Sequence, residues 1–342
     1  MDVTSSRITP PRFASTTSYG EALSDIHVWR LHVRNLLACH KLHLKPNHRV
    51  MRMGTAGTFP TVLVDDAYVV KFFGPLFNGQ ESAAIERAMY RLLATDPTIP
   101  APRLIASGAL APDDDWRWEY IVSTQLPGES YGTVRERLSA ENQREVARFI
   151  ADVTTRIHRL IPAPEPSEPL LLDWKRWDAF MTGQMRSCTE RHRAWGTLPH
   201  RNHLIDQIAP YLARSADLLA HSDPPVLQHC DLTGDHILGE WRGKTWTPTG
   251  IIDFGDAKIG DRVYELVALH IECFGGDKDL LRVFLDRYGC DSMRQPDFAR
   301  RAMSMTLLHE FNVLETVFSC MPEARDVTTL DQLATALWDV NG

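Results

Sequence analysis

Two short segments in the second half of the chain place aspartates where they could carry out phosphoryl transfer. Asp231 and Asp253 each follow a short apolar stretch, in Leu227-Gln-His-Cys-Asp and Gly250-Ile-Ile-Asp. A carboxylate held at the end of a strand can accept the proton of an attacking hydroxyl, and a second can hold Mg²⁺ against nucleotide phosphates. Either string alone is also common as a loop cap or turn. The two together, in this order, favour a phosphotransferase.

A lysine in the first half of the chain fits the same chemistry. Lys71 lies inside the apolar run Val-Val-Lys-Phe-Phe, where burial is costly unless anionic groups are nearby. Nucleotide phosphates and a helix glutamate would supply those groups, whereas a lysine on an edge strand would reach to water. The following helix offers Glu81 and Glu86. They are five residues apart and point to different faces, so helical periodicity does not choose between them.

Two further features fit a nucleotide site less specifically. Gly54, Gly57 and Thr58 belong to a loop between the first two expected strands, and such a loop can bring backbone N–H groups close to phosphates. An ordinary hairpin is the alternative. Ser123 and Gln125, at the end of a later strand, could offer backbone groups to a purine edge.

The elements expected around these residues form a two-lobe α+β fold. Residues 1–24 are rich in Ser, Thr and Pro and are expected to be a poorly ordered tail. An N-lobe over 25–125 would bind the nucleotide, and a helical C-lobe over 126–342 would hold the catalytic and acceptor sites. The N-lobe strands are expected at 49–53, 61–64, 68–73, 103–107 and 118–124, with helices at 26–43 and 79–94. The C-lobe helices are expected at 140–160, 174–188, 202–221, 263–274, 278–288, 298–317 and 329–338, with strands at 226–229 and 250–253.

Composition narrows the class of protein. The chain has 342 residues, 44% hydrophobic and 24% charged, with a net charge of −7, which disfavours a general nucleic-acid binder. The six cysteines form no CxxC pair, and no four-ligand zinc spacing emerges. No secretory signal pattern and no apolar run of ~20 residues is present. We therefore expect a soluble, cytoplasmic protein with no nucleic-acid or membrane partner.

With these motifs in place, the chain resembles the aminoglycoside phosphotransferase family, whose fold is that of protein kinases. Within it, the sequence is most similar to hygromycin B 7″-O-phosphotransferases. The resemblance covers roughly residues 50 to 338. Beyond the generic motifs it includes VVKFFG with QESAAIERAMYRLL, IPAPRLIASGAL, GDRVY at 260–264, LHIECFGGDKDLL, and LLHEFNVLE at 307–315.

The resemblance implies a role for each nucleotide-side and catalytic residue. Asp231 would be the catalytic base, and His229 would support its loop. Asp253 would bind Mg²⁺, and Lys71 would contact the α- and β-phosphates. Glu86, rather than Glu81, would pair with Lys71, and the loop of Gly54, Gly57 and Thr58 would cover the phosphates. The donor would be ATP or GTP.

One position departs from the family pattern. The family normally has Asn five residues after the catalytic aspartate as a Mg²⁺ ligand, and this chain has His236. Mg²⁺ prefers oxygen ligands, although imidazole can bind a metal. Three arrangements stay open: His236 ligates the metal, His236 hydrogen-bonds Asp231 while Asp253 and waters hold Mg²⁺, or the site is impaired.

Acceptor recognition would fall to the acidic C-terminal third, which has 9 basic and 16 acidic residues from Ile251 to Gly342. Carboxylates facing a cleft could bind the ammonium groups of an aminoglycoside, although many such residues are merely solvated. The candidates are Asp256, Asp261, Glu272, Asp277 and Glu310. The leading hypothesis is an antibiotic O-phosphotransferase that gives resistance. The alternatives are a kinase of a nucleoside antibiotic or a metabolite, and a nucleotide-binding pseudokinase.

Overall fold

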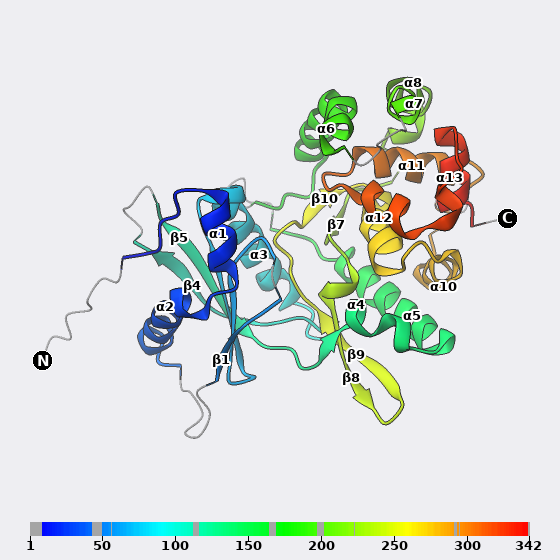
Figure 1. Ribbon diagram of the computed structural model, residues 1–342. Coiled ribbons are helices and arrows are strands. Elements are labelled where there is room, and N and C mark those ends of the chain that lie inside the picture. The colour runs from blue at the N-terminus through cyan, green and yellow to red at the C-terminus, as the bar shows by residue number, and fades with distance from the viewer. Residues whose placement is uncertain are drawn as a thin grey trace, which may run out of the picture. The chain divides into compact units, whose positions relative to one another are not determined.

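A computed structural model (Figure 1) describes residues 9–42, 50–55, 57–111, 116–163, 169–196, 202–221, 223–290, 293 and 295–340. The chain divides into two compact units. The first comprises Met1–Pro97, Ala101–Pro127 and the short segment Asp253–Gly255. The second comprises Thr98–Pro100, Gly128–Ile252 and Asp256–Gly342. Among the described residues, no helix combines the length and the apolar character that crossing a membrane requires.

The first unit is built on a five-stranded antiparallel sheet with the strand order β1-β2-β3-β5-β4. The strands are β1 (Met51–Met53), β2 (Thr61–Val64), β3 (Tyr68–Phe73), β4 (Leu104–Leu110) and β5 (Trp118–Thr124). The helices are α1 (Thr16–Leu23), α2 (Ile26–Cys39) and α3 (Gly79–Leu93), with the short η1 (Leu76–Asn78) before α3. All five strands were expected from the β-branched and aromatic runs of the sequence.

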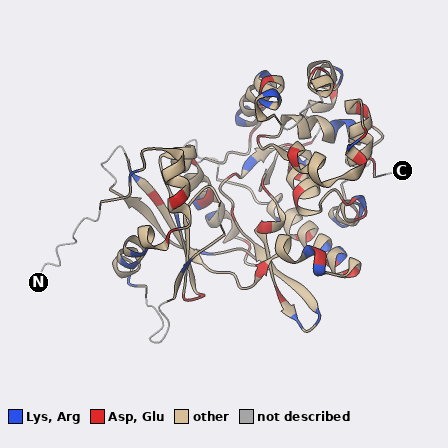
Figure 2. Ribbon diagram, viewed as in Figure 1, with Lys and Arg blue, Asp and Glu red and all other residues tan. Residues whose placement is uncertain are grey.

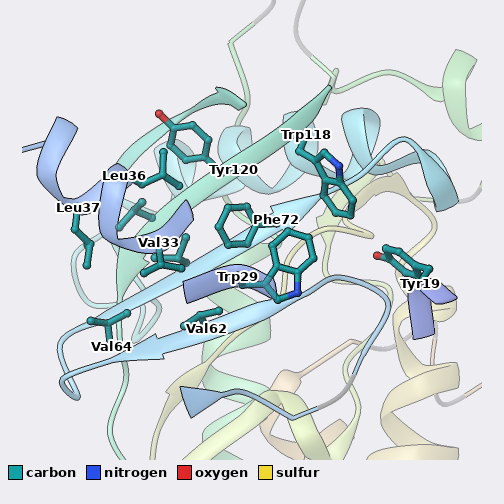
Figure 3. Close-up of a cluster of buried hydrophobic side chains, with 12 residues drawn as sticks. Tyr19, Trp29, Val33, Leu36, Leu37, Val62, Val64, Phe72, Trp118 and Tyr120 are labelled. Carbon is teal, nitrogen blue, oxygen red and sulfur yellow. The ribbon is translucent and has the colours of Figure 1, made fainter. Parts of the chain in front are cut away.

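One face of this sheet is apolar and is covered by α2 (Figure 3). Because successive side chains of a strand point to opposite faces, the even-numbered residues of β3 and β5 share this face. The buried residues here are Val62, Val64, Val70, Phe72, Trp118, Tyr120 and Val122 from the sheet, and Trp29, Val33, Leu36 and Leu37 from α2. The same alternation sends Lys71 to the other face, where α3 packs against β3, β4 and β5.

The expectation of a poorly ordered tail over residues 1–24 is wrong for its described part. Residues 16–23 form α1, whose start is fixed by a capping box between Ser15 and Ser18. Tyr19 on this helix is only 2% exposed. The polar composition concealed a helix whose buried residues belong to the core of the first unit. Residues 1–8 lie outside the described residues.

The second unit is mainly helical. Its strands form a three-stranded sheet of β6 (Glu129–Ser130), β8 (Ile237–Arg242) and β9 (Thr245–Ile251), and a pair of β7 (Val226–Gln228) with β10 (Lys258–Gly260). Its helices are α4 (Tyr131–Val134), α5 (Ala140–Ile157), α6 (Trp174–Trp195), α7 (Asn202–Ile205), α8 (Ile208–Arg214), α9 (Arg262–Ala268), α10 (Lys278–Tyr288), α11 (Phe298–Leu308), α12 (Val313–Cys320) and α13 (Leu330–Trp338). Shorter turns are η2 (Arg135–Arg137), η3 (Ala216–Leu219), η4 (Gly234–His236) and η7 (Pro322–Ala324), and η5 (Leu269–Cys273) is a π-helix.

Three of the expected helices are interrupted. The segment expected as one helix over 202–221 is α7, α8 and η3, and that over 263–274 passes from α-helix to π-helix at Leu269. The segment 298–317 breaks between α11 and α12, where His309 adopts an extended conformation (φ −61°, ψ 142°). There the Glu310 N–H donates to the Tyr264 hydroxyl at 3.1 Å instead of continuing the helix.

Candidate active site

In the first unit, one ammonium group is held between two carboxylates. Lys71 Nζ donates to Glu86 Oε2 at 2.8 Å and to Asp253 Oδ1 at 2.6 Å. The Tyr90 hydroxyl, one turn further along α3, donates to Glu86 Oε1 at 2.9 Å. Glu86, not Glu81, is therefore the helix glutamate that pairs with Lys71. Asp253 joins the pair because the segment Asp253–Gly255 belongs to this unit.

Burial and the neighbouring charges shift the pKa values of Lys71 and Glu86 in opposite directions. Burial by itself lowers the pKa of the Lys71 ammonium, but Asp253 and Glu86 raise it, and the net shift is upward. Burial raises the pKa of Glu86, and the Lys71 charge partly offsets that rise. The Lys71 and Glu86 side chains are 10% and 3% exposed, whereas that of Asp253 is 37% exposed. The cluster thus keeps a charged lysine inside the unit and presents one carboxylate outward.

The backbone at Asp253 is unusual. Its φ of +66° lies in the left-handed region, which aspartate tolerates better than most residues and which is enriched at functional sites. The following Phe254 is fully buried and meets the Tyr90 ring edge-on, with centroids 6.1 Å apart. A buried anchor on one side and a strained backbone on the other fix the direction of the Asp253 carboxylate.

The glycine-containing loop lies between β1 and β2. Its base is closed by a hydrogen bond from the Gly54 N–H to the Thr61 carbonyl at 2.8 Å. A Cβ added at Gly57 would meet nothing within 4 Å, and its φ is not positive. The fold itself therefore does not require glycine at position 57, which is consistent with a ligand approaching the backbone there. Ala56 lies outside the described residues.

The two residues expected to contact a purine are partly engaged in the sheet. Ser123 is 4% exposed and is paired with Val69 on one side and Leu104 on the other. The Gln125 N–H donates to the Ala67 carbonyl at 2.9 Å. The Gln125 N–H is therefore already engaged within the unit, and a contact of Ser123 or Gln125 with a purine edge stays an expectation.

In the second unit, the loop that carries Asp231 is fixed by the residues around it. The Asp231 N–H donates to His229 Nδ1 at 3.3 Å, and His229 Nε2 lies 2.9 Å from the Ile252 carbonyl. His229 is therefore neutral, with its proton on Nε2. Cys230, between them, has a left-handed φ of +68°. The Asp231 side chain remains 23% exposed.

A buried glutamate that the sequence did not single out holds the same loop. Glu265, 2% exposed on α9, accepts a hydrogen bond from the Cys230 N–H at 2.9 Å. Burial raises the pKa of Glu265 to about 7, opposed by hydrogen bonds from the backbone of Cys230 and His229. The sequence does contain an indication of Glu265, because this glutamate is the one charged residue in the otherwise apolar run Val-Tyr-Glu-Leu-Val.

His236 is turned toward the backbone of the Asp231 loop. Its Nδ1 lies 2.6 Å from the Asp231 carbonyl oxygen and 3.7 Å from the carboxylate Oδ2. Of the three arrangements left open by the sequence, this matches hydrogen bonding to Asp231, made through the backbone carbonyl. Nδ1 is thereby occupied by a protein partner.

Two of the five expected acceptor-binding carboxylates cap helices. Asp261 is 5% exposed, caps α9 by accepting from the Val263 N–H at 2.9 Å, and forms a buried ion pair with Arg301 at 2.6 Å. Asp277 caps α10 by accepting from the N–H groups of Asp279 and Leu280 at 2.8 and 3.1 Å. The expectation for Asp261 is corrected, because helix capping and ion pairing occupy both of its carboxylate oxygens. Asp277 is exposed and caps its helix through Oδ1 alone, so its contact with an acceptor stays an expectation.

A third expected carboxylate, Glu310, is neutralised by the chain itself. Lys258 on β10 donates to Glu310 Oε1 at 2.5 Å and to the Asp256 carbonyl at 3.1 Å. Lys258 also lies over the Phe180 ring, 5.1 Å from its centroid. Glu310 thus does not offer an unbalanced charge to a cationic ligand.

Glu272 retains the features expected of an acceptor contact. It lies on η5, and π-helical turns are frequent at functional sites. Burial raises its pKa, a hydrogen bond with Thr316 lowers it, and the charge of Asp231 raises it again. Figure 2 shows that the other acidic residues of the second unit are spread over several helices rather than gathered on one.

The residues of the first unit suit a magnesium ion. Asp253 is a partly exposed carboxylate, the ligand type that Mg²⁺ prefers, and Mg²⁺ bound to nucleotides typically uses one or two carboxylates together with phosphates and water. Within the part of the chain that the structure describes, no group of three or more His, Cys, Asp or Glu side chains forms a complete metal cage. The donor set fits a metal that arrives with a nucleotide.

Solved structures share this architecture. The GDP complex of aminoglycoside 2′-phosphotransferase-IIIa superposes with a TM-score of 0.60, at 17% identity, over 90% of this chain and 95% of that chain. The streptomycin–ATP complex of APH(2″)-IIa gives a TM-score of 0.55, at 17% identity, over 88% of this chain and 97% of that chain. The fold is therefore the protein-kinase-like α+β fold of these phosphotransferases.

The sequence comparison identifies the family. Residues 55–303 match the phosphotransferase enzyme family APH, and the chain belongs to that family. The Arabidopsis thaliana protein named lysine-specific demethylase JMJ21 is 26% identical over 275 residues, which are 65% of this chain and 29% of that protein. The chain thus spans less than a third of that relative's length.

Proposed function

We propose that this chain transfers the γ-phosphate of ATP or GTP to a hydroxyl group of a small molecule. The observation that carries the proposal is the group of Lys71, Glu86 and Asp253, in which Lys71 Nζ lies 2.8 and 2.6 Å from the two carboxylates. A cation with one buried and one exposed carboxylate suits phosphates accompanied by a metal. Membership of the phosphotransferase family supports the proposal.

The reaction assigns a task to each group. The acceptor oxygen attacks the γ-phosphorus in line, the bond from that phosphorus to the β–γ bridging oxygen breaks, and the nucleoside diphosphate leaves. Asp231 orients the acceptor hydroxyl and takes its proton. Lys71 stays charged and balances negative charge on the phosphates. Mg²⁺, when bound by Asp253, supplies further neutralisation of the phosphate oxygens.

For the acceptor, we propose an aminoglycoside-like antibiotic of the hygromycin B type, whose phosphorylation would give resistance. The resemblance of VVKFFG, the GDRVY segment and LLHEFNVLE supports this. Glu272 and Asp256 remain as carboxylates for ammonium groups. The neighbours that bind gentamicin and kanamycin have the same fold, at 19% and 17% identity.

A second acceptor class follows from the partners of the other carboxylates. Asp261 and Glu310 are paired with cations of the chain itself, Arg301 and Lys258. Fewer unbalanced carboxylates favour an acceptor with fewer positive charges than an aminoglycoside, such as a nucleoside antibiotic or a hydroxylated metabolite.

A transfer assay decides between these acceptors and tests the reaction itself. The purified chain, with Mg²⁺ and either ATP or GTP, is offered hygromycin B, other aminoglycosides, a nucleoside antibiotic and neutral polyols. We expect Asp231→Asn to lose at least about 100-fold in turnover, the contribution of a general base, with nucleotide affinity unchanged. Asp217→Asn, an exposed aspartate of η3, is the matched control and should behave as the parent. Transfer that survives in Asp231→Asn would refute the base assignment, and nucleotide binding without transfer to any acceptor would favour a pseudokinase.

A further inference from the structure

The segment that precedes the family match is integrated into the first unit. Residues 9–39 lie before the matched range of 55–303, and they contribute α1 and α2 to the core. The indole N–H groups of Trp116 and Trp118 both donate to the Pro11 carbonyl at 2.9 Å. Within the segment, the Trp29 N–H donates to the Ala22 carbonyl at 2.8 Å. Three indole hydrogen bonds thus hold this segment to the sheet and to itself.

Tyr19 connects this segment to the glycine-containing loop. Its ring packs between aromatic neighbours, edge-on to Phe13 with centroids 5.5 Å apart and stacked on Trp118 with centroids 6.1 Å apart. Figure 3 shows Tyr19 and Trp118. The Tyr19 hydroxyl donates to the Thr58 carbonyl at 2.6 Å. The ring alone would satisfy the packing, so the hydroxyl has a separate consequence, which is to fix the end of the loop that follows Gly57.

The residue that follows Thr58 lies against Lys71, the lysine proposed to bind the phosphates. This residue, Phe59, packs on Phe73 with ring centroids 4.8 Å apart. Lys71 Nζ lies over both rings, 5.8 Å from the centroid of Phe59 and 5.1 Å from that of Phe73. The bond between Tyr19 and Thr58 is thus one residue away from a ring that lies against Lys71.

Other hydrogen bonds hold the residues that follow Thr58. The Gly54 N–H donates to the Thr61 carbonyl at 2.8 Å, and the Phe72 N–H donates to the Pro60 carbonyl at 2.9 Å. The Thr61 hydroxyl donates to the Phe59 carbonyl at 3.2 Å. These three bonds fix residues 59 to 61 and do not involve Thr58. The Tyr19 hydroxyl reaches further, to an exposed residue that directly follows Gly57.

We propose that Tyr19 is a positioning residue for the nucleotide: its hydroxyl holds Gly57 and Thr58 in the conformation that binds the donor's phosphates. This inference rests on the proposed function. Because Thr58 is exposed, water can replace the tyrosine hydroxyl at little cost to folding. Without the tyrosine hydroxyl, the loop is no longer restricted to one conformation. The affinity for a nucleotide that binds only this conformation therefore falls.

The test is Tyr19→Phe, which removes one oxygen and keeps the ring. We expect the dissociation constants for Mg·ATP and Mg·GTP to rise roughly three- to tenfold, the range that one net hydrogen bond gives. The melting temperature without nucleotide should stay within about 2 °C of the parent, since the packing is retained. The KM for the nucleotide should rise while the KM for the acceptor and kcat stay the same.

The control is Tyr211→Phe in the second unit. Tyr211 is 1% exposed, and its hydroxyl has no hydrogen-bond partner among the described residues. It therefore matches Tyr19 in residue type and burial and differs in the bond to the loop. Nucleotide affinity should be unchanged in this variant.

Three results are decisive, and they separate this inference from the proposed function. A dissociation constant for Tyr19→Phe equal to that of the parent overturns the inference alone. A fall in melting temperature with unchanged nucleotide affinity gives Tyr19 a purely structural role and also overturns it. Failure of the parent to bind either nucleotide overturns the proposed function, and the inference with it.

Discussion

Removing the charge of Asp261 tests whether this residue is structural or binds the acceptor. The Asp261 and Arg301 side chains are 5% and 9% exposed, and their charged atoms are 2.6 Å apart. Asp261→Asn keeps the size of the side chain and an oxygen that can cap α9 through the Val263 N–H. The substitution therefore removes the ion pair and little else, and it leaves the Arg301 guanidinium buried.

The expected magnitude follows from that burial. Removing one partner of a buried ion pair costs about 3–5 kcal/mol of unfolding free energy. Arg301 has little else to compensate, because its Nε has no hydrogen-bond partner among the described residues. At roughly 2–4 °C per kcal/mol for a unit of this size, the melting temperature should fall by about 10 °C. Nucleotide and acceptor KM values, measured well below that temperature, should stay unchanged.

Two further variants make the result interpretable. In Asp261→Asn combined with Arg301→Met, no charge is left buried, and stability should return close to that of the parent. Asp277→Asn is the control for capping, because Asp277 is exposed and asparagine caps a helix equally well. Thermal and urea unfolding of the four proteins give the comparison. If Asp261→Asn unfolds like the parent and raises only the acceptor KM, the ion-pair argument is refuted and the residue binds the acceptor.

Two other predictions concern the loop around Asp231. Burial raises the pKa of Glu265 to about 7, well above about 4.3 in an unfolded chain. Its contribution to stability is therefore complete below pH ~4.3 and is lost as pH rises through 7, on the order of 3 kcal/mol. Urea unfolding between pH 5 and 8 should show a flatter dependence for Glu265→Gln than for the parent, and equal slopes would contradict this. His236→Asn should keep at least about a third of the turnover, because an amide can also donate to the Asp231 carbonyl; a loss beyond 100-fold would show a specific imidazole role.

The first unit was predictable because its signals are local. Alternating β-branched and aromatic residues determine β2 and β3 over the residues expected, and the same alternation places Lys71 on the face opposite Val70 and Phe72. The choice of Glu86 over Glu81 came from the family resemblance, since spacing alone left it open. Helix α1 was missed because polar composition was weighed above the capping box of Ser15 and Ser18.

The second unit was harder because its decisive contacts are distant in sequence. The pairing of Lys258 with Glu310 joins residues 52 positions apart, and no local pattern indicates it. The break after α11 depends on the bond between Glu310 and Tyr264, 46 positions apart. Asp277 is different: it follows two glycines and precedes an amphipathic helix, which is a readable N-cap signal.

The path of the chain limits which pieces of the gene can encode the complete first unit. Asp253–Gly255 belongs to the first unit, although residues of the second flank it on both sides. The shortest continuous piece of the chain that contains the complete first unit therefore runs from Met1 to Gly255 and includes Gly128–Ile252 of the second unit. A piece ending at Pro127 would keep Lys71 and Glu86 and lose Asp253. Recombination can therefore pass on this lysine and its two carboxylates together only with Gly128–Ile252, the part of the second unit that contains Asp231.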